Sequence, residues 1–491
     1  LLGISGVEPI SQGLLMERFC SPLRNELPDI DIDVESARRL EIYDAIFARF
    51  GAERTATVAM VETYRARHAF RDVGAALGIS PMEIDLIAKS LPHIRARNIG
   101  KALENLPELK NLKLDTPVMK AAIHLAERLD GLPRHLSMHP CAVLLSDNKL
   151  LDIAPTEINA SGYTMVQFDK DDVEAIGLLK LDVLGVRMQS AISYSLQEIE
   201  RAEGIKVDID AIPLDDLSTF DLIKSTRTLG LFQIESPGQR ELVGKFAPRT
   251  FTDLIIDISL FRPGPVKSDM ITPFINTRHG FRAKPVIHPT LDEILQETEG
   301  VVVFHEQVIR IISVMTGVSL AQADEKRRAL GTFESQQEVC DWFYPAALAQ
   351  GYELALVKQV WEILRAFASF GFCKAHAAAF ALPTYQSAWL KSHHTAAFLA
   401  GVLTHDPGMY PRRVILDEAR QSGIEIAPID INLSEESYRV EKKEDRYAIR
   451  IGLSDIQGAN DKEIDSILLH RPYIDLADFV HRSGASAPTT K

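Results

Sequence analysis

Three aspartates near the start of the chain are spaced as ligands of a divalent cation could be. Asp29, Asp31 and Asp33 lie two residues apart, with a β-branched residue between each pair. Residues two apart on a β-strand point to the same face, so the segment predicts a row of carboxylates about 6–7 Å apart. A divalent cation would offset their repulsion, and hard oxygen ligands favour Mg²⁺ or Mn²⁺. The alternative is an exposed edge strand whose acids pair with Arg38 and Arg39.

A further aspartate interrupts a second apolar segment. Asp182 is the only charged residue of 181–186, and a buried carboxylate needs a partner. Two carboxylates from one strand and one from a neighbouring strand could hold two divalent ions about 3.5–4 Å apart, the arrangement used for in-line nucleotidyl transfer. Lys180, two residues earlier on the same strand face, could contact a phosphate; a plain salt bridge to Asp182 is the alternative.

These acids need a sheet to hold them, and the pattern of the chain predicts a mixed α and β region followed by a mostly helical one. Ser80 and Pro81 predict the start of a helix. The segment 452–458, which has a glycine at each end, and the following 461–469 predict a hairpin of two short helices joined by a glycine turn. The expected strands are 28–34, 55–60, 141–145 and 177–184; the expected helical segments are 37–50, 62–130 and most of the chain beyond 185, with turns at 262–265 and 322–332.

Composition excludes several classes of protein. The 491 residues include 54 Lys and Arg against 68 Asp and Glu, a net charge of −14, which excludes a small, uniformly basic nucleic-acid module. Four widely separated cysteines favour neither a disulfide framework nor a cysteine-rich zinc site, and they fit a reducing cytoplasm. No apolar segment reaches the roughly 18 residues of a membrane span. His135, His139 and Cys141 have the residue types of a metal site, but core packing is the favoured interpretation.

A local excess of positive charge could contact nucleic acid despite the acidic total. Residues 51–101 contain eight Lys or Arg and five acids. Arg65, Arg67 and Arg71 are expected on roughly one helical face, where they would hold a phosphate backbone rather than read bases. A solvated helix face is the alternative.

Four segments together resemble one enzyme family. They are 27–34 with Arg38 and Arg39, 177–185, 260–265 and 372–377, and in this order they resemble the bacterial DNA polymerase III alpha subunit, the family C replicative polymerase. The resemblance implies an α+β fold: a mixed-sheet palm of the nucleotidyltransferase type, an inserted helical thumb and large, mostly helical fingers. The implied domains are palm at 1–50 and 131–190, thumb at 51–130, fingers at 191–433, and the end of the fingers with a possible helix-hairpin-helix element at 434–491.

The resemblance also implies roles for individual residues. The catalytic, metal-binding aspartates fall on Asp31, Asp33 and Asp182, whereas Asp29 matches a position not counted among the ligands. The implied nucleotide-binding residues are Lys180, Arg262, Lys374 and His376, and the implied DNA-binding residues are Arg65, Arg67, Arg71, Arg327 and Arg328.

Some positions depart from the family pattern. Cys373 and Ala375 replace the usual Asn and Ser beside Lys374, and a Gly-Lys-Lys run expected after 326–333 is missing. Together with the segments 64–68 and 71–74, the last departure makes the chain resemble the error-prone branch more than the main replicase.

The expected function is therefore DNA-directed DNA polymerase activity with Mg²⁺ or Mn²⁺, in replication and in error-prone repair synthesis. Expected partners are primer–template DNA, dNTPs, and a sliding clamp and other replication or repair proteins bound through regions absent here; a bacterial cytoplasm, with nucleoid association and no membrane, is the expected location. A truncated, inactive DNA-binding fragment is the main alternative, favoured by the lack of the family's glycine- and serine-rich palm segment. A metal-dependent nuclease would leave the element around Lys374 and His376 without a purpose.

Overall fold

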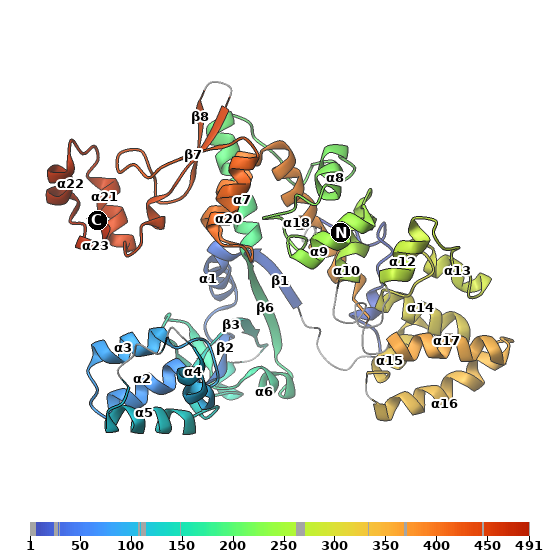
Figure 1. Ribbon diagram of the computed structural model, residues 1–491. Coiled ribbons are helices and arrows are strands. Elements are labelled where there is room, and N and C mark those ends of the chain that lie inside the picture. The colour runs from blue at the N-terminus through green and yellow to red at the C-terminus, as the bar shows by residue number, and fades with distance from the viewer. Residues whose placement is uncertain are drawn as a thin grey trace. The chain divides into compact units, whose positions relative to one another are not determined.

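The computed structural model describes residues 6–23, 28, 30–106, 109, 114–147, 149–261, 271–331, 333–367, 371–443 and 446–490 (Figure 1). Arg262 and its proline- and glycine-rich loop lie outside these residues, as does Asp29. The chain divides into two compact units. The first comprises residues 1–25, 34–38 and 185–491, and the second comprises 26–33 and 39–184. Helices and strands both occur, so the expected α+β class is confirmed.

The second unit is built on a mixed sheet with strand order β1-β6-β3-β2-β5-β4. Strands β2 and β3 pair antiparallel, as do β3 and β6, and small or branched residues such as Val58, Ala142 and Leu144 are buried in its core. The strands are β1 Ile30–Glu35, β2 Thr55–Thr63, β3 Pro133–Leu145, β4 Thr156–Ile158, β5 Thr164–Val166 and β6 Leu179–Val186, and helices α1 Arg39–Phe50 and α6 Lys170–Ala175 accompany them.

Strand β3 contains a wide bulge at 139–142. On strand β2, Thr57 pairs with Val143 and Ala59 with Met138, so four residues of β3 face a single residue of β2. Pro140 lies inside the bulge, a position that proline tolerates because it donates no ladder hydrogen bond. Bulges re-aim side chains, and this one lies beside the ladder between β3 and β6.

A helical block follows strand β2 in the second unit. The Ser80 hydroxyl accepts the backbone N–H of Glu83, and Pro81 opens the helix, as the sequence predicts. Strand β2 belongs to the sheet, so the helices of the range 51–130 begin only after it. They are α2 Ala66–Ala76, α3 Pro81–Ser90, α4 Ile99–Asn105 and α5 Pro117–Arg128, packed around a shared apolar core (Figure 1).

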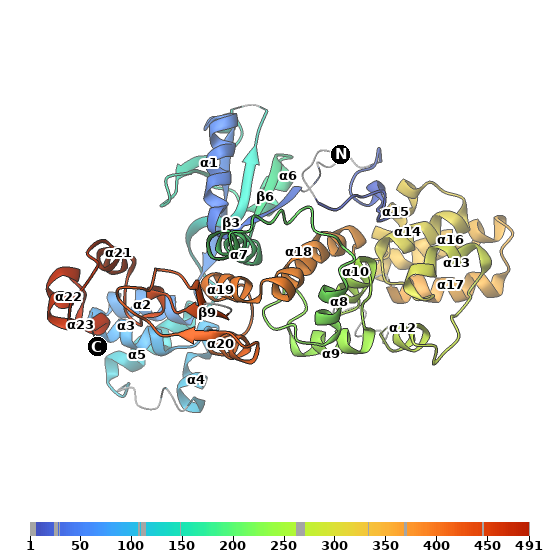
Figure 2. The same cartoon turned by 90° about the horizontal axis from the view of Figure 1, so that it is seen from above.

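Helices dominate the first unit, which has two large apolar cores. The helices around the larger core are α7 Arg187–Glu203, α8 Leu217–Lys224, α9 Pro237–Phe246, α10 Phe251–Leu260, α12 Ile271–Arg278, α18 Lys374–His393, α19 Thr395–His405 and α20 Arg412–Gln421. The other core is formed by α13 Pro289–Leu295, α14 His305–Thr316, α15 Leu320–Ala329, α16 Phe333–Ala349 and α17 Leu354–Phe367, which cluster together in Figure 2.

Helix α15 corrects one prediction. The turn expected at 322–332 is helical as far as Ala329, because Ser319 and Gln322 form a reciprocal capping box at its start.

The end of the first unit is a three-stranded sheet followed by short helices. Its strands, in the order β7-β9-β8, are β7 Glu425–Ala427, β8 Arg439–Lys443 and β9 Arg446–Arg450. The later helices are α21 Asp461–Leu469, α22 Leu476–Ser483 and α23 Ala487–Thr490. A short 3-10 helix at Leu453–Asp455 precedes the glycine-containing turn at 456–458, so short helices lie on both sides of this turn, as expected. Within the residues that the structure describes, no helix has both the length and the apolar character to span a lipid bilayer.

Candidate functional site

Neighbouring strands of the sheet carry the predicted metal-binding aspartates. Asp31 and Asp33 alternate with apolar residues along β1, and Asp182 lies on β6, which is next to β1 in the sheet. Partial desolvation raises the pKa of Asp33, and the Asp31 carboxylate raises it further. The local sequence thus places like charges together, as expected from residues two apart on a strand.

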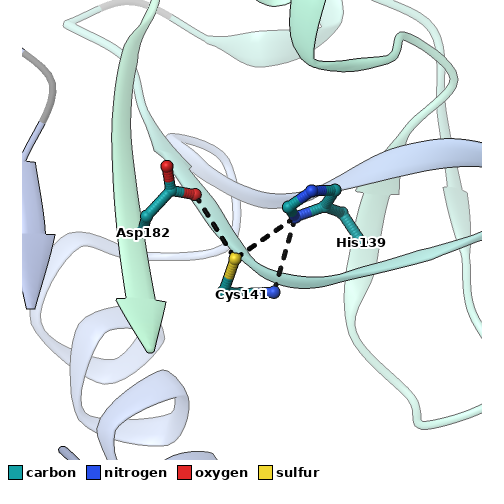
Figure 3. A group of neighbouring side chains, drawn as sticks. All are labelled: His139, Cys141 and Asp182. Atoms are coloured by element: carbon teal, nitrogen blue, oxygen red, sulfur yellow. Dashed lines mark hydrogen bonds between the residues drawn. The ribbon is translucent and has the colours of Figure 1, made fainter. Parts of the chain in front are cut away.

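Asp182 is held from two sides. Its Oδ2 lies 3.2 Å from the Lys180 ammonium, the salt bridge that was the alternative interpretation of Lys180. Its Oδ1 accepts the Cys141 thiol at 3.6 Å (Figure 3). The backbone explains this contact, because Asp182 pairs with Ala142 across the β3–β6 ladder and Cys141 lies in the adjoining bulge.

His139 completes a cluster that the sequence did not predict. Its Nδ1 lies 3.6 Å from the Cys141 sulfur and accepts the backbone N–H of Ala142 at 3.2 Å. Burial lowers the pKa of His139, whereas burial and the Asp182 carboxylate raise the pKa of Cys141 to about 11. One ligand atom from each of the three side chains lies within 4.8 Å of the others.

The three aspartates do not form such a group. Among the described residues, the cluster of three or more potential ligands within 4.8 Å is His139, Cys141 and Asp182, without Asp31 or Asp33. The convergence of the aspartates on a metal ion therefore stays a prediction.

His135 is separated from the other two residues of its sequence motif. Its Nε2 lies 2.9 Å from the Glu62 carboxylate, which also lies 2.9 Å from His68 Nδ1. Strand pairing explains the first contact, since Glu62 is opposite His135 across β2 and β3. The cluster thus takes its third ligand from β6 rather than from His135.

The arginines of the helical block differ in their hydrogen-bond and ion-pair partners. Arg65 precedes helix α2 with extended backbone angles, so the expectation of one shared helical face is wrong for it. Arg67 donates to the carbonyl of Leu91 at 2.7 Å, and Arg71 lies 2.7 Å from Asp85. Arg65 is exposed and has no ion pair or side-chain hydrogen bond to any described residue.

In the first unit, Lys374 begins helix α18 and is nearly buried. Its side chain is 7% exposed, and its ammonium lies 2.7 Å from the Glu297 carboxylate and 5.6 Å from the centre of the Phe304 ring. The buried carboxylate of Glu306 accepts the Lys374 backbone N–H at 2.9 Å, and so occupies the positive end of the helix. His376 is exposed, and its ring makes an edge-to-face contact with the ring of Phe380.

Arg327 and Arg328 share one buried acid. Asp324 lies 2.8 Å from Arg327 Nε and 3.3 Å from Arg328 Nε on helix α15. Burial lowers the pKa of Arg327. The DNA contact expected of both arginines stays a prediction.

Arg18 and His305 lie close to Arg327, and sequence reasoning missed both. Burial lowers the pKa of His305 to about 3, and the charges of Arg327 and Arg18 lower it too. Arg18 Nε and His305 Nδ1 are buried without a hydrogen-bond partner among the described residues. No sequence signal joins three residues so far apart along the chain. The unsatisfied N–H of Arg18 lies in the positive field of two arginines, which suits an anion.

Comparison with known proteins identifies the family. The sequence matches three family models: the bacterial DNA polymerase III alpha NTPase domain over residues 1–185, the finger domain of the same subunit over 188–350, and a helix-hairpin-helix motif over 423–491. The last match covers the range for which a helix-hairpin-helix element was predicted.

Curated relatives carry one name. Proteins called error-prone DNA polymerase match at 34% identity over 514 residues in Symbiobacterium thermophilum and at 36% over 498 in Teredinibacter turnerae, each covering 99% of this chain. A third, from Pseudomonas aeruginosa, is 36% identical over 499 residues and also covers 99% of the chain. These alignments cover 47%, 48% and 48% of the relatives, so the chain spans about half of their length. The placement near the error-prone branch is confirmed, and the chain belongs to the bacterial DNA polymerase III alpha-subunit family.

Proposed function

We propose that this chain is the core of a DNA-directed DNA polymerase that extends a primer by metal-dependent nucleotidyl transfer. The observation that carries the proposal is the set of three aspartates on two adjacent strands of one sheet, in a chain of this family. In this proposal the sheet of the second unit is the palm, its helices α2 to α5 are the thumb, and the first unit supplies the fingers.

The aspartates suit Mg²⁺ in chemistry and charge. All three offer carboxylate oxygens, the ligands that Mg²⁺ prefers. Desolvation raises the pKa of Asp33 and the Asp31 carboxylate raises it further, and a cation would neutralise the repulsion between the two acids. When bound, the metal would act as a Lewis acid: it would lower the pKa of the primer hydroxyl and neutralise charge on the leaving group. Asp31, Asp33 and Asp182 would hold it there, and Lys180 would exchange its salt bridge with Asp182 for a phosphate oxygen.

Cationic groups of the first unit would bind the incoming dNTP. Lys374 offers an ammonium whose present partner is a single carboxylate, 33% exposed. Arg18 and Arg327 lie close together, and an anion would accept the hydrogen bond that Arg18 Nε, buried without a partner among the described residues, can donate. His376 and Arg262 are proposed to complete the nucleotide site on the basis of the family resemblance.

Duplex DNA would contact the helices of the second unit and the end of the first. Arg65 is the clearest phosphate ligand, because neither an acid nor a carbonyl among the described residues engages its side chain. Four other arginines would add to the positive electrostatic potential that attracts DNA while keeping their present partners in the protein: Arg67, Arg71, Arg327 and Arg328. A helix-hairpin-helix motif at 423–491 is a second place where DNA would bind.

The remaining features of the proposal follow from the family. The relatives' name suggests a role in error-prone repair synthesis. A sliding clamp and other replication or repair proteins would bind through parts of the longer protein, and the bacterial cytoplasm, close to the nucleoid, would be its location.

Primer extension tests the proposal. A 5′-labelled primer on a template of known next base is incubated with Mg²⁺ and one dNTP at a time, using this chain and its full-length parent. We expect one-nucleotide extension with the complementary dNTP and none with EDTA.

Three results would overturn part or all of this function. Shortened primers would indicate a nuclease. A full-length parent that binds the duplex but never extends the primer would contradict the polymerase assignment. If only the 491-residue chain binds without extending the primer, this chain is the inactive DNA-binding fragment.

A further inference from the structure

We propose that His139, Cys141 and Asp182 form a binding site for a soft divalent cation, with zinc as the occupant, which shares only Asp182 with the proposed hard-metal site of the three aspartates. The site is built from a thiol, an imidazole and a carboxylate on two paired strands (Figure 3). This combination of ligands is typical of zinc, whereas Mg²⁺ prefers oxygen ligands alone.

The distances fit a tetrahedral ion. With zinc about 2.3 Å from sulfur and about 2.0–2.2 Å from nitrogen or oxygen, tetrahedral angles place the sulfur roughly 3.5 Å from each of the other two ligand atoms. The observed separations are 3.6 Å from Cys141 Sγ to His139 Nδ1 and 3.6 Å from Cys141 Sγ to Asp182 Oδ1. The two edges of the tetrahedron that meet at sulfur are therefore already formed. A water molecule would take the fourth position.

The bulge in β3 keeps the ligands in place. Arg39 and the Tyr43 hydroxyl both donate hydrogen bonds to the carbonyl of Pro140, between the two β3 ligands. The register of β3 and β6 then fixes Asp182 opposite the end of the bulge. Backbone that is held in this way lowers the cost of ordering the ligands, so the site needs little rearrangement to bind a metal.

Hydrogen bonds now occupy the ligand atoms. His139 Nδ1 accepts the backbone N–H groups of Cys141 and Ala142, and Asp182 Oδ1 accepts the Cys141 thiol. Zinc would displace these contacts but leave the salt bridge between Asp182 Oδ2 and Lys180 in place, because it needs only Oδ1. The Cys141 thiol would lose its proton to solvent on binding, as metal-bound thiols do.

The site has a consequence for catalysis that rests on the proposed function. Asp182 is a member of both ligand sets, so zinc at the cysteine would withhold this carboxylate from Mg²⁺. Zinc is therefore expected to inhibit primer extension, and Cys141 is the residue that would make the polymerase sensitive to it.

Cobalt absorption tests the site without any polymerase assay. The reduced, metal-free chain is titrated with Co²⁺, which gives a sulfur-to-cobalt charge-transfer band and visible tetrahedral bands when a thiolate binds it. We expect a saturable charge-transfer band that Zn²⁺ abolishes. The band should be lost in Cys141→Ser and Cys141→Ala, and kept in Cys340→Ser, a matched control at another half-buried thiol. His139→Gln should weaken zinc binding at least about tenfold, since even an outer-shell change costs 10- to 100-fold.

The opposite results would overturn the site. A wild-type chain without a saturable band would do so, and so would a band that survives in folded Cys141→Ala. If both Cys141 variants unfold, alkylation of the wild-type chain decides instead: zinc should slow iodoacetamide modification of Cys141 but not of Cys340, and equal rates at both thiols would contradict the proposal.

Primer extension then separates this inference from the proposed function. Zinc inhibition is expressed for each protein as a fraction of its own rate with Mg²⁺ alone, and it should be at least tenfold weaker in Cys141→Ala. Cobalt binding without any polymerase activity would uphold the metal site and overturn the function. Polymerase activity without a cobalt band would uphold the function and overturn the metal site.

Discussion

Nucleotide binding by Lys374 requires its ammonium to move from the Glu297 carboxylate to a phosphate of the nucleotide. The substitution Glu297→Gln keeps the size of the acid and removes its charge, and Lys374→Met removes the ammonium. If Lys374 binds the triphosphate, the two substitutions should move the KM for dNTP in opposite directions: Glu297→Gln should lower it and Lys374→Met should raise it.

The geometry of the pair sets the magnitude. At 2.7 Å and an effective dielectric constant of about 20, the Coulomb attraction is about 6 kcal/mol before desolvation is subtracted. The net value of a hydrogen bond to a charged group is about 1.5–3 kcal/mol. Since about 1.4 kcal/mol corresponds to tenfold, each substitution should change the KM by about tenfold or more. Both variants should also unfold more easily, because each leaves a partly buried charge without its partner.

Steady-state extension by the full-length parent, with dNTP varied at saturating primer–template, measures these changes. Glu241→Gln is the matched control, because it breaks another Lys–Glu pair, that of Lys245 at 2.6 Å on the exposed surface of helix α9. A higher KM in Glu297→Gln, or an unchanged KM in Lys374→Met, would show that the pair only stabilises the fold and that Lys374 does not bind nucleotide.

Two further predictions concern DNA binding and stability. Arg65→Ala should reduce the slope of log K against log salt for duplex binding by about 0.9. Arg71→Ala should change this slope less, because Arg71 is already paired with Asp85. Equal slopes in the wild type and both variants would show that Arg65 does not contact DNA. The second concerns Asp257, whose pKa burial raises well above its usual range. The native state therefore keeps this proton to higher pH than the unfolded state, and the wild-type chain loses up to about 1.4 kcal/mol of stability per pH unit above the ordinary aspartate range. Urea unfolding of Asp257→Asn should show a stability advantage over wild type that grows from pH 4 to pH 7, and an advantage that shrinks with pH would contradict the buried, protonated carboxyl.

Local patterns in the sequence predicted the elements that hold the aspartates. Alternation at Asp31 and Asp33 predicted strand β1, the apolar segment around Asp182 predicted β6, and Ser80 with Pro81 predicted the start of α3. These signals are local, because strand alternation and helix capping depend on residues within a few positions of one another.

Contacts between distant segments could not be predicted from the sequence. Cys141 meets Asp182 across 41 positions, through a bulge whose length only the strand register reveals. Lys374 meets Glu297 across 77 positions. Neither pairing leaves a periodic or spacing signal, so the sequence could suggest that these residues are functional but not which side chains they contact.

The central claim is that Asp31, Asp33 and Asp182 hold the metal for nucleotidyl transfer. The most direct measurement is the single-turnover rate of primer extension, with saturating Mg²⁺ and dNTP, in the full-length parent carrying Asp31→Asn, Asp33→Asn or Asp182→Asn, with Asp29→Asn as the control. We expect a loss of about a thousandfold in each of the three, equivalent to about 4 kcal/mol of transition-state stabilisation, with duplex binding kept and Asp29→Asn within a few-fold of wild type. A rate for Asp182→Asn within a few-fold of wild type, or an equal loss in Asp29→Asn, would show that these aspartates do not hold the catalytic metal.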